Sequence, residues 1–254
     1  GFMAGMSLGL YQRQITDYVK WSKRMGQTAT LQWLSIFLQT AQNLETTTPE
    51  PHKLIGVHLN ENEWLSNAVT AGDISGRLYL YLNKLILSYH FDIDDKLEAY
   101  CNKTEAFRAN VAGQVYYAFS FFYYGLAKLR LSPALNQEDM VSVTDSLRLM
   151  EIWSETAPST FQHKFDLMTA EKARVTGDLD GALTHYEQAI SGAHKYGFIH
   201  EEALANELYA RFWAQRNNDR FAGLLMREAH NLYQKWGAHA KADHLAKQYP
   251  KLVS

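Results

Sequence analysis

Apolar residues recur every three or four positions along most of the chain, and this spacing constrains the fold more than any other feature. Residues three and four apart lie on one face of an α-helix, so such a stripe is typical of an amphipathic helix that buries one side. No stretch alternates strictly between apolar and polar residues, as a half-buried strand would. The clearest stripes are Leu31, Leu34, Phe37, Leu38, Ala41 and Leu44; Leu78, Leu82, Leu85 and Tyr89; and Val143, Leu147, Met150 and Trp153. The sequence therefore predicts an all-α fold.

The five prolines divide this helical pattern into segments. Proline removes a backbone donor and its ring clashes with the preceding turn, so a helix is expected to break near each of them. The expected breaks are at Pro49, Pro51, Pro133, Pro158 and Pro250.

A pattern of small and aromatic residues in the last third of the chain occurs twice, forty residues apart. The first copy is Ala170, Ala173, Gly177, Asp178, Ala182, Tyr186 and Ala189, and the second is Ala210, Trp213, Asn217, Asn218, Ala222, Met226 and Ala229. Each copy predicts a helix hairpin, in which small residues allow close approach and Gly177 and Asp178 make the turn. A hairpin cannot bury its inner face alone, so the hairpins are expected to stack.

These spacings resemble the tetratricopeptide repeat (TPR), with units at 163–195 and, where Met226 replaces the aromatic residue, 203–236. The offset exceeds the family's 34 residues, so helices or linkers longer than standard are expected. At about 40 residues a unit, the chain holds roughly six hairpins, or about twelve helices. We therefore expect residues 1–254 to form a single TPR-like domain, a right-handed solenoid of stacked antiparallel helix hairpins.

Charge and composition exclude several classes of protein. The chain has 25 Lys and Arg against 27 Asp and Glu, without the basic footprint of a nucleic-acid-binding protein. Its one cysteine, Cys101, cannot form an internal disulfide, which fits a reducing cytoplasm. The uncharged run Val111–Ala127 is shorter than the roughly 20 residues of a membrane span. Since the chain also begins without Met or a signal peptide, we expect a cytoplasmic fragment of a longer protein, with neither nucleic acid nor membrane as a partner.

Several blocks resemble the helical-repeat region of large bacterial signalling proteins. Those proteins join a serine/threonine kinase, a STAND-type AAA ATPase, this helical region, a GAF domain and a histidine kinase. The blocks are residues 200–213, 228–241 and 244–250, with further likeness at 80–87 and 161–168. The resemblance implies a domain that has no chemistry of its own and couples partner binding to the ATPase or kinase of the parent protein.

Motifs for catalysis, cofactors or metals are weak or missing. Neither glycine-rich nucleotide motif is present, and the nucleophile-elbow match Gly5–Gly9 has only four residues before it, too few for the strand that an elbow needs. The acidic residues Asp92, Asp94 and Asp95 are best explained as helix-start acids. No two histidines in the last quarter of the chain have the i, i+4 spacing of a helical zinc site. We expect no cofactor, no metal and no enzymatic activity in this chain.

The concave groove of a TPR-like stack is the most interesting surface, because the first helix of each unit lines it. The polar candidates there are Lys164, Glu171, Arg174, Glu207, Arg211 and Gln215. Arg174 and Arg211 could pair with a partner's carboxylates, since the planar guanidinium suits that task. The alternative is that these acids and arginines pair with each other, within or across units.

The favoured interpretation is a non-catalytic interaction and regulatory domain of a signalling kinase, which binds a protein, a peptide or neighbouring domains. Alternatives are a helical-repeat domain of a transcription activator that senses a small effector, or an all-α enzyme. The aromatic run Tyr116–Tyr124 could be an effector site, but a helix with aromatic residues on every side is better explained as a central core helix.

Overall fold

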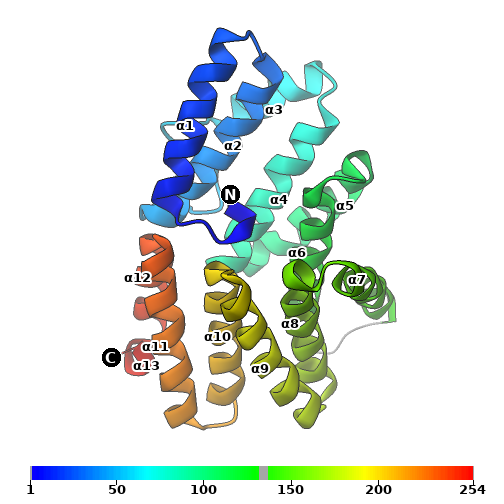
Figure 1. Cartoon of the computed structure of the whole chain (residues 1–254), viewed down its shortest axis with the longest axis vertical. Helices are drawn as coiled ribbons and strands as arrows, with labels where there is room; N and C mark the ends of the chain where they lie inside the picture. The colour runs from blue at the N-terminus through cyan, green and yellow to red at the C-terminus, as the bar shows by residue number, and fades with distance from the viewer. Residues whose placement is uncertain (1, 132–136, 254) are drawn as a thin grey trace.

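The computed structural model describes the backbone of residues 2–131 and 137–253, which is helical throughout (Figure 1). No strand forms among these residues, where thirteen α-helices are accompanied by the 3₁₀ helices η1 (Phe2–Ala4) and η2 (Ala109–Val111). The α-helices are α1 (Leu8–Arg24), α2 (Thr28–Glu45), α3 (Glu61–Thr70), α4 (Ile74–His90), α5 (Asp94–Arg108), α6 (Val115–Leu131), α7 (Gln137–Thr156), α8 (Pro158–Thr176), α9 (Leu179–Tyr196), α10 (Ile199–Ala214), α11 (Asp219–Trp236), α12 (His239–Gln248) and α13 (Pro250–Val253). The predicted all-α fold is confirmed.

Consecutive helices pack as pairs that stack in chain order. The most extensive pairings are α8 with α9 and α10 with α11, the two units in which the sequence repeat lies. One helix of each pair also contacts its counterpart in the next pair, so α4, α6, α8 and α10 form a continuous layer, here called the inner layer. The offset of forty residues is explained by helix length, because α8 and α9 have 19 and 18 residues and a short turn joins them.

The turns of the repeat have the same backbone geometry in both units. Gly177 follows α8 with a φ of 81°, and Asp178 caps α9 by accepting a hydrogen bond of 3.0 Å from the amide three residues on. Asn217 takes a φ of 57° before α11, which Asn218 caps in the same way. Gly and Asn adopt this left-handed conformation with little strain. The turn predicted at Gly177 and Asp178 is therefore confirmed.

Proline positions match helix ends wherever the structure describes them. Pro49 and Pro51 lie in the segment that joins α2 to α3. Pro158 and Pro250 are the first residues of α8 and α13, where a missing amide proton costs nothing. The break expected at Pro133 lies outside the described residues.

Helix α6 is the centre of the core. It contacts α4, α5, α7 and α8, and residues 118–127 are all buried. Gly125 lets α8 come close, since a Cβ there would lie 2.3 Å from the Cε of Met168. The aromatic run Tyr116–Tyr124 thus packs as a core helix, as the simpler interpretation predicted.

The two ends of the stack meet. Helix α12 packs against α2, and Figure 1 shows the N-terminal segment in blue close to α10 and α12. The indole of Trp236 donates a hydrogen bond of 2.9 Å to the carbonyl of Met6. At Gly5, a Cβ would lie 2.5 Å from the carbonyl oxygen of Gly197. These contacts join the first helices of the chain to the last ones.

No helix in residues 2–131 or 137–253 combines the length and apolarity that crossing a membrane requires.

Candidate functional site

A polar hollow of about 240 Å³ opens on the inner layer. It is lined by Tyr89, Arg130, Glu171, Arg174, Leu208, Arg211 and Gln215, and we call it the arginine hollow. These residues come from the C-terminal parts of α4, α6, α8 and α10 and from the residue after α10. Four of the six residues predicted to face a groove therefore line one hollow, although α8 and α10 are separated by a whole helix.

Glu171 and Arg174 pair with each other across one turn of α8. The guanidinium donates from Nε and Nη2 to the carboxylate at 3.1 and 2.8 Å, and Tyr186 donates its hydroxyl proton to the same carboxylate. The Glu171 side chain is only 3 % exposed, whereas that of Arg174 is 20 % exposed. The carboxylate is thus buried behind the guanidinium, which faces the hollow.

Arg211 forms a two-point contact with Asp92. Nη1 and Nη2 donate to Oδ1 and Oδ2, each at 2.8 Å, and Nη2 also contacts the carboxylate of Glu207 one turn earlier. Burial alone would raise the pKa of Asp92, but the hydrogen bond from His244 and the charge of Arg211 outweigh it and hold that pKa well below its usual value.

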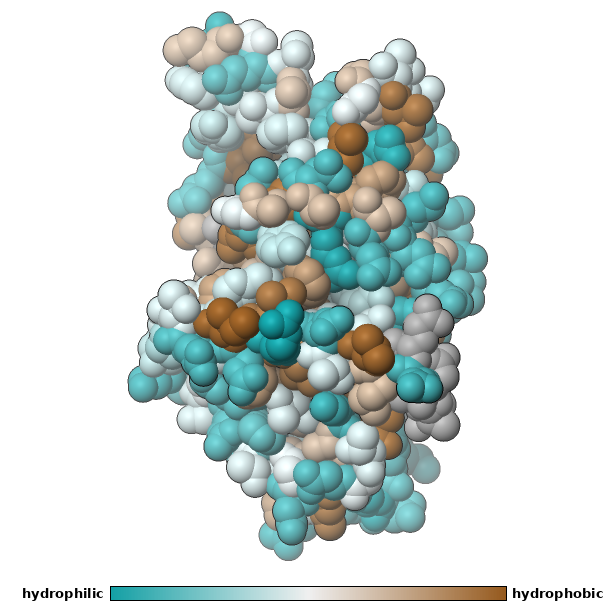
Figure 2. Space-filling view, turned by 90° about the vertical axis from the view of Figure 1, so that its right-hand side faces the viewer, coloured by the Kyte–Doolittle hydropathy of each residue, from teal (hydrophilic) through white to brown (hydrophobic). Residues whose placement is uncertain are grey.

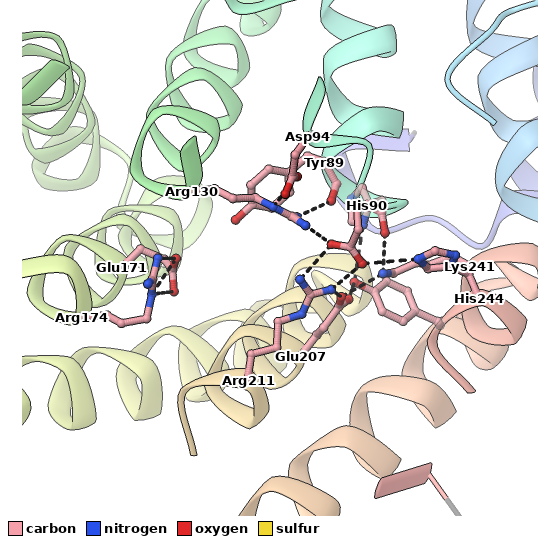
Figure 3. Close-up of polar contacts among 12 residues, drawn as sticks. Tyr89, His90, Asp94, Arg130, Glu171, Arg174, Glu207, Arg211, Lys241 and His244 are labelled. Atoms are coloured by element: carbon pink, nitrogen blue, oxygen red, sulfur yellow. Dashed lines mark hydrogen bonds and ion pairs between the residues drawn. The ribbon is translucent and has the colours of Figure 1, made fainter. Parts of the chain in front are cut away.

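Helix α12 completes this cluster from the other side (Figure 3). Lys241, which is fully buried, donates to Glu207 at 2.9 Å and to the carbonyl of His90. Tyr233 donates to the second oxygen of Glu207 at 2.8 Å, and His244 lies 3.3 Å from Asp92. Burial raises the pKa of Glu207, yet the ammonium of Lys241 and the guanidinium of Arg211 lower it below its usual value. The result is a buried ion network that joins α10 and α12 to the end of α4.

Arg130 attaches α6 to the same place. Its Nη1 donates to the carbonyl of Tyr89 at 2.9 Å, its Nη2 contacts Asp92, and its Nε lies 2.8 Å from Asp94. Asp92 is therefore shared by two arginines from different helix pairs.

Two polar atoms on the wall of the hollow have no hydrogen-bond partner among the described residues. They are the hydroxyl of Tyr89, a residue 2 % exposed, and the Nε of Arg211. Burial and the nearby Glu171 carboxylate raise the pKa of Tyr89, so its hydroxyl stays protonated and can donate at neutral pH. Buried donors without partners are uncommon in proteins and call for an explanation.

The other two predicted groove residues lie behind the surface. Glu207 is 2 % exposed and belongs to the buried network. Lys164 is completely buried, donates to the carbonyl of Thr160 at 2.8 Å and pairs with Glu201 at 2.7 Å, beside His163. This places Lys164 at the contact between α8 and α10, away from the arginine hollow.

The sequence did not lead us to predict that Asp92, Arg130, Tyr89 and Lys241 belong to this site. A signal for Asp92 was present, because it occupies the turn after α4 with a φ of 56°, the conformation that Gly177 takes in the repeat. Asp94 and Asp95 do lie in the first turn of α5, as predicted for helix-start acids, but Asp92 lies before the helix and points to α10.

The residues considered for a metal site and for a nucleophile elbow lie in the described part of the chain. No three side chains of His, Cys, Asp or Glu lie together there as a metal site would require. Ser7 of the elbow-like match directly precedes α1 and follows η1, so the strand that a nucleophile elbow needs is not present in residues 2–9. His90, within the ion network, has its pKa lowered to about 3 by burial and by the ammonium of Lys241, so it is neutral.

Comparison with known proteins shows a partial similarity to a signalling protein. Over 117 residues, 46 % of this chain, the sequence is 31 % identical to the hybrid signal transduction histidine kinase G of Dictyostelium discoideum. The match covers 3 % of that protein's length. No family model matches the chain, and no solved structure matches it.

Proposed function

We propose that this chain is an interaction and regulatory module of a signalling protein, which binds a protein, a peptide or a neighbouring domain on its inner layer. The similarity to a hybrid histidine kinase supports a role in signal transduction. Within such a parent protein, the helical stack would couple binding to an ATPase or kinase outside these residues. Coupling of this kind requires that the partner bind two states of the parent with different affinity.

The observation that carries the proposal is the distribution of charge at the arginine hollow. The side chains of Arg130, Arg174 and Arg211 are 15 %, 20 % and 17 % exposed. Among the acidic side chains paired with them, Asp92, Glu171 and Glu207 are 9 %, 3 % and 2 % exposed. Asp94, which pairs with Arg130, is 56 % exposed but is not among the residues that line the hollow. A partner that enters the hollow therefore meets arginine side chains that are more exposed than Asp92, Glu171 and Glu207, and their ion pairs hold the arginines in place before binding, which reduces the entropy lost on binding.

Selection of peptides on the intact chain tests the proposal. Random peptides displayed on phage are selected on the immobilised protein, and the affinities of enriched peptides are measured by fluorescence anisotropy. The variant Gln215→Glu adds a negative charge to the exposed edge of the hollow, so we expect it to weaken binding by about tenfold. The matched variant Gln14→Glu, at an exposed position of α1, should leave binding unchanged.

Two results would overturn the proposal. One is that no peptide is enriched above the level seen with an unrelated helical protein. The other is that Gln14→Glu and Gln215→Glu change peptide affinity equally, which would place binding away from the inner layer.

A further inference from the structure

We infer that the arginine hollow is a receptor for a single carboxylate group. The inference rests on the proposed function and deepens it by naming the chemistry that the site recognises. It starts from the two buried donors without a partner among the described residues, the Tyr89 hydroxyl and the Arg211 Nε. Both atoms belong to residues that line the same hollow, so an oxyanion bound there would lie beside the two residues whose donors lack a partner.

The geometry of Arg174 and Gln215 supports the same ligand. Arg174 uses Nε and Nη2 for Glu171, and its Nη1 has no hydrogen-bond partner within the described part of the chain. Gln215 lies exposed at the rim and carries an amide that can donate. The hollow thus offers donors from α4, α8 and the end of α10 around one space (Figure 3 shows Tyr89, Arg174 and Arg211).

Charge balance favours one negative charge over two. Around the hollow, four cations (Arg130, Arg174, Arg211 and Lys241) face four carboxylates (Asp92, Asp94, Glu171 and Glu207), each within an ion pair. The cluster is therefore neutral overall. Three of its cations line the hollow, whereas among its carboxylates only Glu171 does, so the hollow itself favours an anion. The single negative charge of a carboxylate needs little positive charge to balance it, whereas the two negative charges of a phosphate dianion beside Glu171 would be poorly balanced.

Size and apolar surface define the rest of the ligand. Typical small-molecule pockets measure roughly 300–1,000 Å³, so a hollow of about 240 Å³ holds a carboxylate with a few carbon atoms and excludes a nucleotide. Leu208 and the ring of Tyr89 supply an apolar wall for those carbons. An acidic side chain or C-terminus of a peptide meets this description, and so does a small free carboxylic acid.

Ligand-observed NMR on the intact chain tests the inference with butyrate and its neutral analogue butyramide. We expect butyrate to bind and butyramide not to bind. Tyr89→Phe removes only the hydroxyl and should weaken butyrate binding by about tenfold, the worth of a hydrogen bond to a charged group. Arg174→Lys keeps the charge beside Glu171 but loses the planar donors, and should also weaken it. Tyr18→Phe, at an exposed position of α1, is the matched control and should have no effect.

Peptides distinguish the two sources of the carboxylate and separate this inference from the proposed function. Pentapeptides with a free C-terminus are compared with the same peptides as C-terminal amides, in the wild type and in Tyr89→Phe. If peptide binding is lost both on C-terminal amidation and in Tyr89→Phe, the ligand of the hollow is the carboxylate of a peptide. Binding of butyrate with no peptide binding supports the carboxylate site but overturns the protein-interaction function. The carboxylate inference is overturned if butyrate and butyramide bind equally, or if Tyr89→Phe leaves butyrate binding unchanged. Peptide binding that tolerates both C-terminal amidation and Tyr89→Phe leaves the proposed function standing.

Discussion

Asp92 and Arg211 are 119 residues apart in sequence, and their side chains meet through two parallel hydrogen bonds of 2.8 Å. Asp92 occupies a left-handed turn position, and its carboxylate projects from that turn to α10. The contact ties the fourth helix of the chain to the tenth and places the guanidinium of Arg211 at the hollow. Asp92 therefore occupies a turn position that usually favours Gly or Asn and is also the centre of the ion network.

Replacement of Asp92 tests how much this contact stabilises the fold. Asp92→Asn keeps the size of the side chain and tolerates the positive φ, but it removes the charge that Arg130 and Arg211 share. Because the carboxylate is nearly buried, breaking the pair should lower the free energy of unfolding by about 3 kcal/mol. Urea denaturation followed by circular dichroism measures the change. Asp17→Asn, whose side chain is 74 % exposed, is the control and should change stability by less than about 0.5 kcal/mol. Equal stability of the two variants would show that the network is structurally dispensable.

The lowered pKa of His90 predicts that the protein loses stability as the pH falls from 6.5 to 5. Burial and the Lys241 ammonium lower its pKa from 6.5 to about 3, so over this range only the unfolded chain takes up the proton. A group whose folded pKa lies below its unfolded pKa loses stability as the pH falls through the unfolded value. At pH 5 the difference of about 1.5 pH units corresponds to roughly 2 kcal/mol.

The measurement is the free energy of unfolding of the wild type and of His90→Gln at pH 7 and pH 5. Buried His163 also has a lowered pKa and contributes in the same direction, so the wild-type curve alone does not isolate His90. The variant should lose roughly 2 kcal/mol less than the wild type between the two pH values. Parallel pH curves for the two proteins would contradict the prediction.

The sequence predicted the parts of the fold that local physics determines. Apolar spacing identified the helices, and the pairs Gly177–Asp178 and Asn217–Asn218 marked turns because few residues take a positive φ. Of the residues predicted to face a groove, Glu171, Arg174 and Arg211 lie on first helices of repeat units and Gln215 directly follows one, and these four line one hollow.

The partners of those residues could not be predicted in the same way. Arg211 pairs with Asp92, and Lys241 reaches Glu207 and the backbone of His90, over separations that no periodicity encodes. The alternative that the groove acids and arginines pair with each other is found within helices, where Glu171 pairs with Arg174 and Glu207 pairs with Arg211. Contacts that depend on how the stack curves and where its ends meet require the three-dimensional arrangement.

Lys164 and Glu201 offer a test of buried charge at the contact between α8 and α10. Lys164→Met leaves the fully buried Glu201 with only its histidine neighbours, and we expect a loss of about 3 to 5 kcal/mol. The double variant Lys164→Met with Glu201→Gln removes both charges and should recover at least half of that loss. Urea denaturation of the wild type, of Lys164→Met, of Glu201→Gln and of the double variant forms a double-mutant cycle. A double variant no more stable than Lys164→Met would contradict a direct charge interaction.

Gly5 and Gly26 form a matched pair that tests the contact between the two ends of the stack. Both have a positive φ, 74° and 67°, so substitution by Ala strains the backbone by about 1 to 2 kcal/mol at each. Only at Gly5 would the added Cβ meet backbone, at 2.5 Å from the carbonyl of Gly197, whereas nothing lies within 4 Å at Gly26. Gly5→Ala should therefore lower the melting temperature more than Gly26→Ala. It should also speed hydrogen exchange in residues 2–9, because the Met6 carbonyl that accepts the Trp236 indole moves with Gly5. Equal effects of the two substitutions would mean that the N-terminal segment is held by its side chains, and that close backbone approach at Gly5 contributes nothing to joining the ends.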